Sequence, residues 1–339
     1  MEGLDLTALD RHLRSEGIAR AGALRAELIS GGRSNLTFLV ADDASKWVLR
    51  RPPLHGLTPS AHDMGREYRV VAALHGTAVP VARAVTMRDD DTVLGAPFQM
   101  VEYVPGRVIR TAAQLDTLGG VAEISACVDA LIVVLAQLHA VDPNAVGLGD
   151  FGKPAGYLQR QVRRWGSQWD LVRRADDPSD ADVHRLHAAL GQALPQHSRA
   201  SIVHGDYRID NTILDSADAA RVVAVLDWEL STLGDPLSDA ALMCVYRDPL
   251  FDLVLPTGGA AWAAPLMPSA DDLAHRYSLA AGQPLEHWPF YMSLAYFKVA
   301  IIAAGIAFRS RMGGGAAESD RASEAVGAFV AAGLNALKA

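Results

Sequence analysis

Three polar residues whose side chains suit phosphate chemistry lie near the middle of the chain. Asp206 follows His204 and Gly205, Asn211 comes five positions later, and Asp227 ends an apolar run. Phosphoryl transfer uses one carboxylate at the acceptor hydroxyl. It also uses a carboxylate and an amide to hold the magnesium ions that bridge the nucleotide phosphates. The same residue types also fit a pair of hairpin turns, in which Asp and Asn stabilise the bend.

Two short apolar runs, 212–214 and 222–226, must position these residues. Runs of this length between turn residues predict strands. A loop, strand, turn and strand would bring the three polar side chains to one point, although 21 positions separate Asp206 from Asp227.

The motifs HGDYRIDN (204–211) and LDWE (226–229) resemble the catalytic and metal-binding segments of the aminoglycoside phosphotransferase family, which shares the protein-kinase fold. The resemblance implies that Asp206 orients or deprotonates the acceptor hydroxyl and that Asn211 and Asp227 bind magnesium. Arg208, in the same loop, could neutralise charge on the transferring group. In kinases Phe-Gly follows the metal-binding aspartate, whereas Trp-Glu follows it here.

A glycine-rich segment, SGGRSN at 30–35, lies between two predicted strands. Such a segment can turn its backbone N–H groups toward phosphates. Gly-Gly is equally a hairpin signal. With the family resemblance, we expect nucleotide binding by Gly32, Arg33, Ser34 and Asn35.

The next predicted strand, KWVLR at 46–50, ends at Arg50. Protein kinases carry a phosphate-binding lysine on this strand, paired with a glutamate of the following helix. The resemblance assigns these places to Arg50 and to Glu67 of the helix at 64–74. Arginine stays charged and can bind phosphate with two N–H groups. Lys46 is an alternative phosphate ligand, and a surface ion pair is the alternative for Arg50.

The segment PFQMVEYVPG (97–106) resembles the crossing from the small to the large lobe of the family. The resemblance implies that the backbone of Glu102, Tyr103 and Val104 bonds the adenine edge of ATP, with Met100 just before it. It further implies an α+β, bilobal protein-kinase-like fold, with ATP and magnesium in the cleft. A nucleotide-binding lobe with a small antiparallel sheet is expected at 1–104. A mainly helical catalytic and acceptor-binding lobe is expected at 105–339.

Composition limits the possible partners. The chain has 339 residues, of which 50% are hydrophobic, and its formal charge is −8. This excess of acids argues against a general nucleic-acid or anionic-membrane surface. Cys127 and Cys244 lie in apolar stretches and are expected to be buried, inert thiols of a cytoplasmic protein. The first residues contain no signal-peptide pattern.

Four motifs narrow the resemblance to a subgroup found beside, or fused to, acyl-CoA dehydrogenases: GGRSNLTF, VLRRPP, REYRV and LDWELSTLGDP. This association implies a hydroxyl acceptor on a hydroxy fatty acid or a hydroxyacyl-CoA, and a functional link to an acyl-CoA dehydrogenase. The cations Lys298, Arg309 and Arg311 favour an anionic acceptor. An aminoglycoside or choline acceptor is the alternative, as is a pseudokinase that binds nucleotide without turnover. No flavin site is evident, so we expect no dehydrogenase activity.

Other polar residues are expected to be structural. His139 should end a helix, and His204 should hydrogen-bond backbone within its loop. Asp235 is expected to be structural, and Asp239 to anchor the loop from inside the protein. The basic and aromatic helix at 157–174 is expected to bury one face, with binding of an anionic acceptor as the alternative.

Overall fold

The computed structural model describes residues 3–30, 35–52, 63–196, 199–254, 259–312 and 316–338. The chain forms two compact units. The first unit contains Met1–Gly106 and a returning segment, Val223–Ser231, and the second contains Arg107–Val222 and Thr232–Ala339. The expected boundary at 104 lies close to this division, but the return of the chain at Val223–Ser231 was not predicted.

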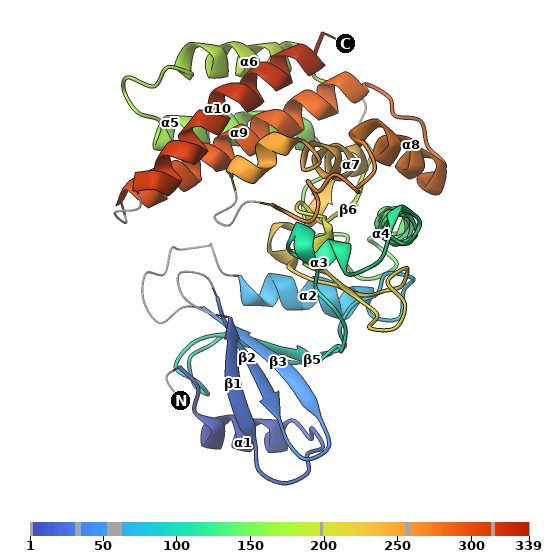
Figure 1. Cartoon of the computed structure of the whole chain (residues 1–339). Helices are drawn as coiled ribbons and strands as arrows, with labels where there is room; N and C mark the ends of the chain where they lie inside the picture. Colours follow the sequence, from blue (N-terminus) through green and yellow to red (C-terminus); the bar gives the residue numbers. More distant parts are fainter. Residues whose placement is uncertain are drawn as a thin grey trace. The chain divides into compact units, whose positions relative to one another are not determined.

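The first unit is built on an antiparallel sheet of five strands in the order β1-β2-β3-β5-β4 (Figure 1). Its elements in chain order are α1 (Leu6–Ser15), β1 (Arg25–Ser30), β2 (Leu36–Ala41), β3 (Lys46–Arg51), α2 (Met64–Leu74), β4 (Ala84–Arg88) and β5 (Phe98–Glu102). The returning segment adds the end of β8 (Val222–Val225) and the short 3₁₀ helix η2 (Trp228–Leu230).

The two faces of this sheet have different partners because side chains alternate along a strand. Leu49 pairs with Met100 across β3 and β5, and both are buried with Leu9 and Leu13 of α1. The next pair, Arg50 and Gln99, therefore lies on the opposite face, where the α2 side chain Glu67 contacts both. The alternation of side chains along β3 thus places Arg50 on the face opposite Leu49.

Helix α2 begins where Asp63 accepts a hydrogen bond from Arg66 N–H at 2.9 Å. Its buried side recurs at helical spacing: Met64, Glu67, Val70, Val71 and Leu74. A carboxylate in that stripe is costly to bury unless it has partners. The place of Glu67 among the buried positions of α2 therefore indicates that its carboxylate has polar partners.

The second unit is mainly helical. Its helices are α3 (Ala112–Asp116), α4 (Val121–Ala140), α5 (Tyr157–Val172), α6 (Asp180–Gln192), α7 (Pro236–Val245), α8 (Ala270–Ala281), α9 (Trp288–Met312) and α10 (Ala316–Ala336). Shorter elements are β6 (Ser201–Val203), η1 (Ile209–Asn211), β7 (Thr212–Leu214), β9 (Thr232–Gly234) and η3 (Pro249–Leu253). Figure 1 shows α9 and α10 running side by side, and both also contact α6.

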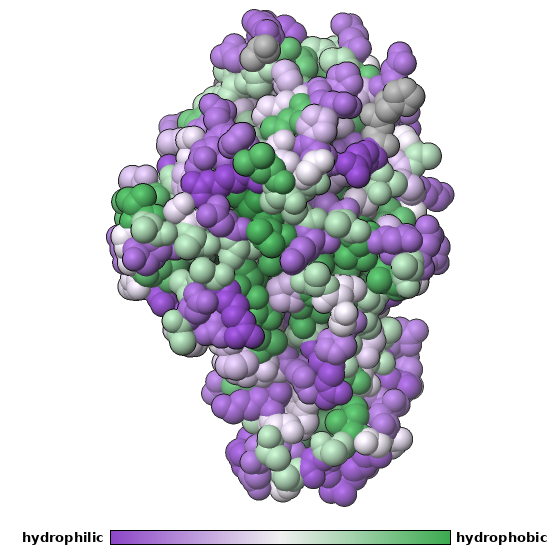
Figure 2. Space-filling view, turned by 90° about the vertical axis from the view of Figure 1, so that its right-hand side faces the viewer, coloured by the Kyte–Doolittle hydropathy of each residue, from purple (hydrophilic) through white to green (hydrophobic). Residues whose placement is uncertain are grey.

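Helices α4 and α9 form much of the core of the second unit. Both are long and apolar enough to cross a membrane by length and composition, but half of the apolar window of α4 and 72% of that of α9 are buried within the protein. Burial inside the unit accounts for their composition. On the face seen in Figure 2, hydrophobic residues lie among hydrophilic ones, as on ordinary protein surfaces.

Candidate active site

The loop that carries Asp206 connects β6 to η1, and a buried carboxylate anchors its backbone. Asp239 of α7 accepts hydrogen bonds from His204 N–H at 2.6 Å and from Gly205 N–H at 2.8 Å. Gly205 has a backbone φ of 85°, which residues with a Cβ atom rarely adopt. The prediction that Asp239 anchors the loop is confirmed.

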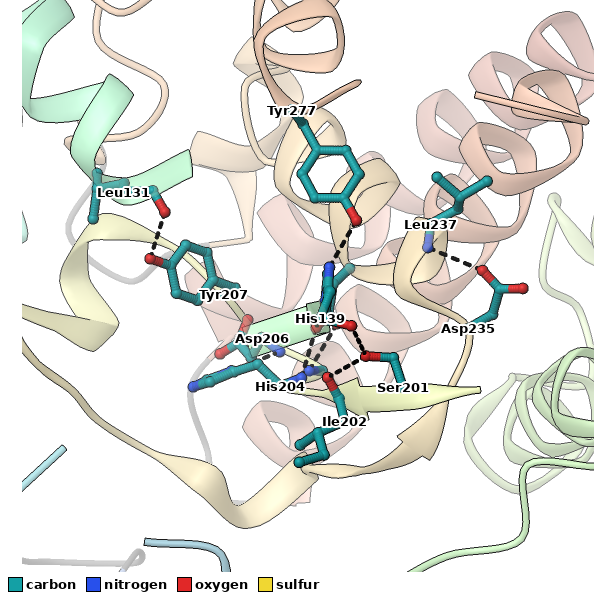
Figure 3. Close-up of polar contacts among 12 residues, drawn as sticks. Leu131, His139, Ser201, Ile202, His204, Asp206, Tyr207, Asp235, Leu237 and Tyr277 are labelled. Carbon is teal, nitrogen blue, oxygen red and sulfur yellow. Dashed lines mark hydrogen bonds and ion pairs between the residues drawn. The ribbon is translucent and has the colours of Figure 1, made fainter. Parts of the chain in front are cut away.

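His139 at the end of α4 extends this anchor. Its Nδ1 lies 2.7 Å from the Tyr277 hydroxyl, and its carbonyl accepts from Ser201 Oγ (Figure 3). Its Nε2 lies 3.3 Å from an Asp239 oxygen. Burial alone would raise the pKa of Asp239. The hydrogen bonds and partial charges of His139 and His204 outweigh burial and lower it. Asp239 therefore stays ionised, and both histidines are structural, as predicted.

Figure 3 also shows His204 beside Asp206. The His204 ring accepts the Asp206 N–H through Nδ1 at 3.2 Å. The Tyr207 hydroxyl donates to the Leu131 carbonyl of α4 at 2.8 Å. The backbone on both sides of Asp206 is thus tied to the helical core.

The Asp206 carboxylate is hydrogen-bonded through both of its oxygens. Asn211 Nδ2 donates to Oδ2 at 3.0 Å and to the Asp206 carbonyl at 2.8 Å, so its amide oxygen is the atom left for a ligand. The Tyr246 hydroxyl donates to Oδ1, and Arg208 Nε lies 3.4 Å from the same oxygen. The predicted pair Asp206 and Asn211 is thus brought together within the second unit.

Arg208 is held beside Asp206 by acids and rings. Its guanidinium lies 3.0 Å from Asp210 Oδ2 and stacks 5.4 Å from the Tyr246 ring centre and 5.5 Å from that of Phe251. Burial raises the pKa of Asp210, against the lowering effect of Arg208. Arg208 is placed where it can act on charge near Asp206.

Lys298 of α9 reaches the same loop. Its Nζ donates to the Gly205 carbonyl at 2.6 Å and lies 5.7 Å from the centre of the Trp165 ring. Burial lowers the pKa of Lys298, against the raising effect of Asp206 and Asp239. Arg309 and Arg311 lie at the far end of α9, about 16 Å or more along the axis from Lys298. Of the three predicted cations, Lys298 is the one at the loop.

A second cluster of predicted residues lies in the first unit. Arg50 forms an ion pair with Glu67 at 2.9 Å and lies 3.6 Å from Asp227 Oδ1. Lys46 is exposed, and its ammonium lies 5.9 Å from the centre of the Tyr103 ring. Arg50 therefore occupies the position, opposite the glutamate of α2, that the sequence predicted for a phosphate ligand.

Glu67 is 3% exposed and is surrounded by charge. Gln99 Nε2 donates to its Oε2 at 2.5 Å, a contact that the sequence did not predict. Burial is the largest cause that raises the pKa of Glu67 to about 7; Arg50 acts in the opposite direction, while Asp227 and Glu229 raise the pKa further. Gln99 pairs with Arg50 across β3 and β5, so both side chains lie on the face where α2 places Glu67.

Asp227 has a left-handed backbone, with φ of 62°, which is uncommon for a residue with a side chain. Its Oδ1 and the Oε1 of Glu67 are buried and have no hydrogen-bond partner among the described residues. Such oxygens fit a hard divalent cation, which prefers carboxylate and amide oxygens. Asp227 in the first unit and Asn211 in the second thus both offer oxygen donors that magnesium accepts.

The predicted adenine-binding segment follows β5. Glu102 N–H donates to the Arg83 carbonyl at 2.8 Å, and Tyr103 N–H donates to the Lys46 carbonyl at 3.0 Å. For Val104 N–H, the described residues provide no hydrogen-bond acceptor. The side chain of Met100 lies in the α1 core, on the face opposite Arg50, so any contact with nucleotide would have to come from its backbone.

The glycine-rich segment is only partly described. Gly32, Arg33 and Ser34 lie outside the described residues. Asn35 is 3% exposed, and neither its amide nitrogen nor its amide oxygen has a hydrogen-bond partner in the described part of the chain. An unpaired buried amide is costly and fits a polar ligand.

A family model described as "Phosphotransferase enzyme family" matches residues 25–273. The chain belongs to this family.

Solved structures of phosphotransferases share its fold. A crystal structure from Ralstonia eutropha, whose name places it among aminoglycoside phosphotransferases, is 34% identical, covers 98% of both chains and has a TM-score of 0.81. A thermostable mutant of an aminoglycoside phosphotransferase, in complex with AMP-PNP and hygromycin B, is 16% identical and has a TM-score of 0.62 over 96% of this chain and 99% of that one. The chain has the α+β, kinase-like fold that the sequence predicted.

Curated relatives carry a different kind of name. Acyl-CoA dehydrogenase family member 10 of Mus musculus is 35% identical over 90% of this chain, and acyl-CoA dehydrogenase family member 11 of Homo sapiens is 34% identical over 91%. The chain spans only 28% of the mouse relative and 39% of the human one. The predicted association with acyl-CoA dehydrogenase family members is confirmed at the level of sequence similarity.

Proposed function

We propose that this phosphotransferase transfers the γ-phosphoryl group of ATP, with magnesium, to a hydroxyl of a small molecule. The observation that carries the proposal is the Asp206 carboxylate, which Asn211 holds from one side at the end of an anchored loop. A fixed carboxylate is suited to orient an acceptor hydroxyl and to take its proton.

The residues of the first unit would act on the nucleotide. Arg50 is suited to bind phosphate oxygens with two N–H groups. Val104 N–H has no acceptor among the described residues and is suited to bond an adenine edge. Asp227 and Asn211 would hold magnesium, which supplies a positive charge for the phosphate oxygens. Binding of ATP is supported by the complex of a structural neighbour with AMP-PNP.

We further propose that the acceptor is anionic, such as a hydroxy fatty acid or a hydroxyacyl-CoA. Two observations support this assignment. Two relatives named after acyl-CoA dehydrogenases, from mouse and human, share 34–35% identity with the chain. The ammonium of Lys298 lies at the loop next to Asp206, where it would favour an anion over a cationic amino sugar.

An aminoglycoside is the second candidate acceptor, because a neighbour of the same fold was solved with hygromycin B and a Streptomyces vinaceus viomycin phosphotransferase is 35% identical over 29% of this chain. The two candidates differ in charge, so a direct comparison of acceptors separates them.

The experiment is mass spectrometry of acceptors after incubation with magnesium and ATP. One panel contains hydroxyacyl-CoAs, free hydroxy acids, aminoglycosides and choline. We expect a phosphorylated hydroxyacyl or hydroxy-acid product. A product only from an aminoglycoside or choline would replace the acceptor assignment, and firm ATP binding without any product would favour the pseudokinase alternative.

A further inference from the structure

The Asp206 carboxylate is fixed by a donor that no motif in the sequence indicates. Tyr246 lies 40 positions later, just after the last residue of α7, and its hydroxyl donates to Asp206 Oδ1. Asn211 donates to the other oxygen. Two donors on the two oxygens define the plane of the carboxylate, which one donor cannot do.

The surroundings of Tyr246 make this contact rigid. Tyr246 is 4% exposed, and its ring packs 4.6 Å from the ring of Phe251, centre to centre. Burial and the nearby Asp206 raise the pKa of Tyr246 far above its ordinary value. The phenol thus keeps its proton and remains a donor at neutral pH.

Tyr246 also contacts the cation of the loop. The Arg208 guanidinium stacks over the Tyr246 and Phe251 rings while it faces Asp206 and Asp210. One aromatic side chain therefore contacts both predicted catalytic residues of the second unit.

We propose that Tyr246 is a positioning residue, which holds the Asp206 carboxylate by Oδ1 so that its remaining lone pairs face the acceptor hydroxyl. This inference rests on the proposed phosphoryl transfer. An ionised carboxylate oxygen offers two lone-pair sites, so the Tyr246 bond fixes Oδ1 without exhausting it. Without that bond the carboxylate turns about its side-chain torsions, and fewer of its orientations are productive.

The test is Tyr246→Phe, which removes only the hydroxyl and keeps the ring under Arg208. The matched control is Tyr296→Phe, because the Tyr296 hydroxyl also donates to a carboxylate, Asp248 Oδ2, at 3.1 Å. We expect Tyr246→Phe to lower kcat about tenfold or more, with KM for ATP and for the acceptor changed less than about twofold. Tyr296→Phe should leave kcat unchanged.

An unchanged kcat in Tyr246→Phe would overturn the inference, and so would an equal loss in both variants. A rise in KM with kcat preserved would also overturn it, because it would make Tyr246 a binding residue. Such results leave the phosphotransferase proposal intact, since the unchanged protein still turns over.

If the unchanged protein transfers phosphate to no acceptor, the proposed function is refuted and kcat cannot be compared. A second measurement then tests whether Tyr246 holds Asp206. Tyr246→Phe is compared with and without Asp206→Ala in a double-mutant cycle of urea unfolding. We expect Tyr246→Phe to raise the unfolding equilibrium constant about tenfold more when Asp206 is present. Equal effects in both backgrounds would show that Tyr246 does not hold Asp206 and would overturn the inference.

Discussion

At the scale of single residues, the alternation of β3 decides which cation faces the acids of the first unit. Arg50 faces Glu67 and Asp227, whereas Arg51 is buried on the other face and donates to the Leu94 carbonyl at 3.1 Å. The Arg50 side chain is 23% exposed, so its ion pair with Glu67 is not an ordinary surface ion pair. A nucleotide phosphate would compete with the carboxylates of Glu67 and Asp227 for the Arg50 guanidinium.

Arg50→Ala is therefore expected to weaken ATP binding in the presence of magnesium by about ten- to a hundredfold. This is the usual loss of affinity when a charge-assisted hydrogen bond is removed. Titration calorimetry with AMP-PNP measures the change directly. Lys46→Ala is the control, because Lys46 is an exposed cation on the same strand. A larger loss in Lys46→Ala than in Arg50→Ala would transfer the phosphate-binding role to Lys46.

Glu67 gives the first unit a pH-dependent stability. Its pKa is about 7 in the folded protein against an ordinary value near 4.5, so between these values the folded state binds a proton that the unfolded state has lost. The stabilising contribution is complete below about pH 4.5 and is lost as pH rises through about 7.

Relative to Glu67→Gln, which carries no titrating group, the unchanged protein should lose on the order of 3 kcal/mol of unfolding free energy between pH 4.5 and a pH well above 7. Urea unfolding of both proteins across this range gives the difference. Parallel curves for the two proteins would show that Glu67 does not titrate in this range.

At the scale of elements, the loop of Asp206 depends on a helix that follows it in the chain. The first turn of α7 supplies Asp239, and α4 supplies His139, so two helices fix one loop through a single buried carboxylate. Asp235, the N-cap of the same helix, accepts from Leu237 N–H at 3.0 Å (Figure 3). It also accepts from the Tyr291 hydroxyl at 2.9 Å.

Asp239→Asn is expected to destabilise the protein by about 3 kcal/mol, since an amide can accept with only one of its two terminal atoms and leaves a buried N–H without a partner. Asp10→Asn changes a partly exposed carboxylate of α1 that pairs with the exposed Arg14, and it should cost less than about 1 kcal/mol. Chemical denaturation compares the two. A loss in Asp239→Asn no larger than in Asp10→Asn would contradict the anchoring role.

Local elements could be predicted from sequence because their signals are local. The strand at Lys46–Arg51, the helix at Met64–Leu74 and the pair Asp206 and Asn211 follow from short periods and a short motif. Gln99 and Tyr246 were missed for a different reason. Their partners lie 32 and 40 positions away, and only the packed fold brings them together.

At the scale of the whole molecule, the chain is two compact units that divide the predicted residues between them. Arg50, Glu67 and Asp227 belong to the first unit, and Asp206 and Asn211 to the second. The assignment of Asp227 to the first unit could not be predicted from its position in the chain, because the segment Val223–Ser231 returns after more than a hundred residues of the second unit.

The proposed function requires both sets of residues in one reaction. The most direct measurement is transfer of labelled γ-phosphate from ATP to a hydroxyacyl-CoA or hydroxy acid, by the unchanged protein and by Asp206→Asn, with ATP affinity measured in parallel. The account predicts a labelled product, a turnover lowered by about 10²–10⁴-fold in Asp206→Asn, and an ATP affinity within about twofold. Equal turnover in the two proteins, or failure of the unchanged protein to bind ATP, would contradict it.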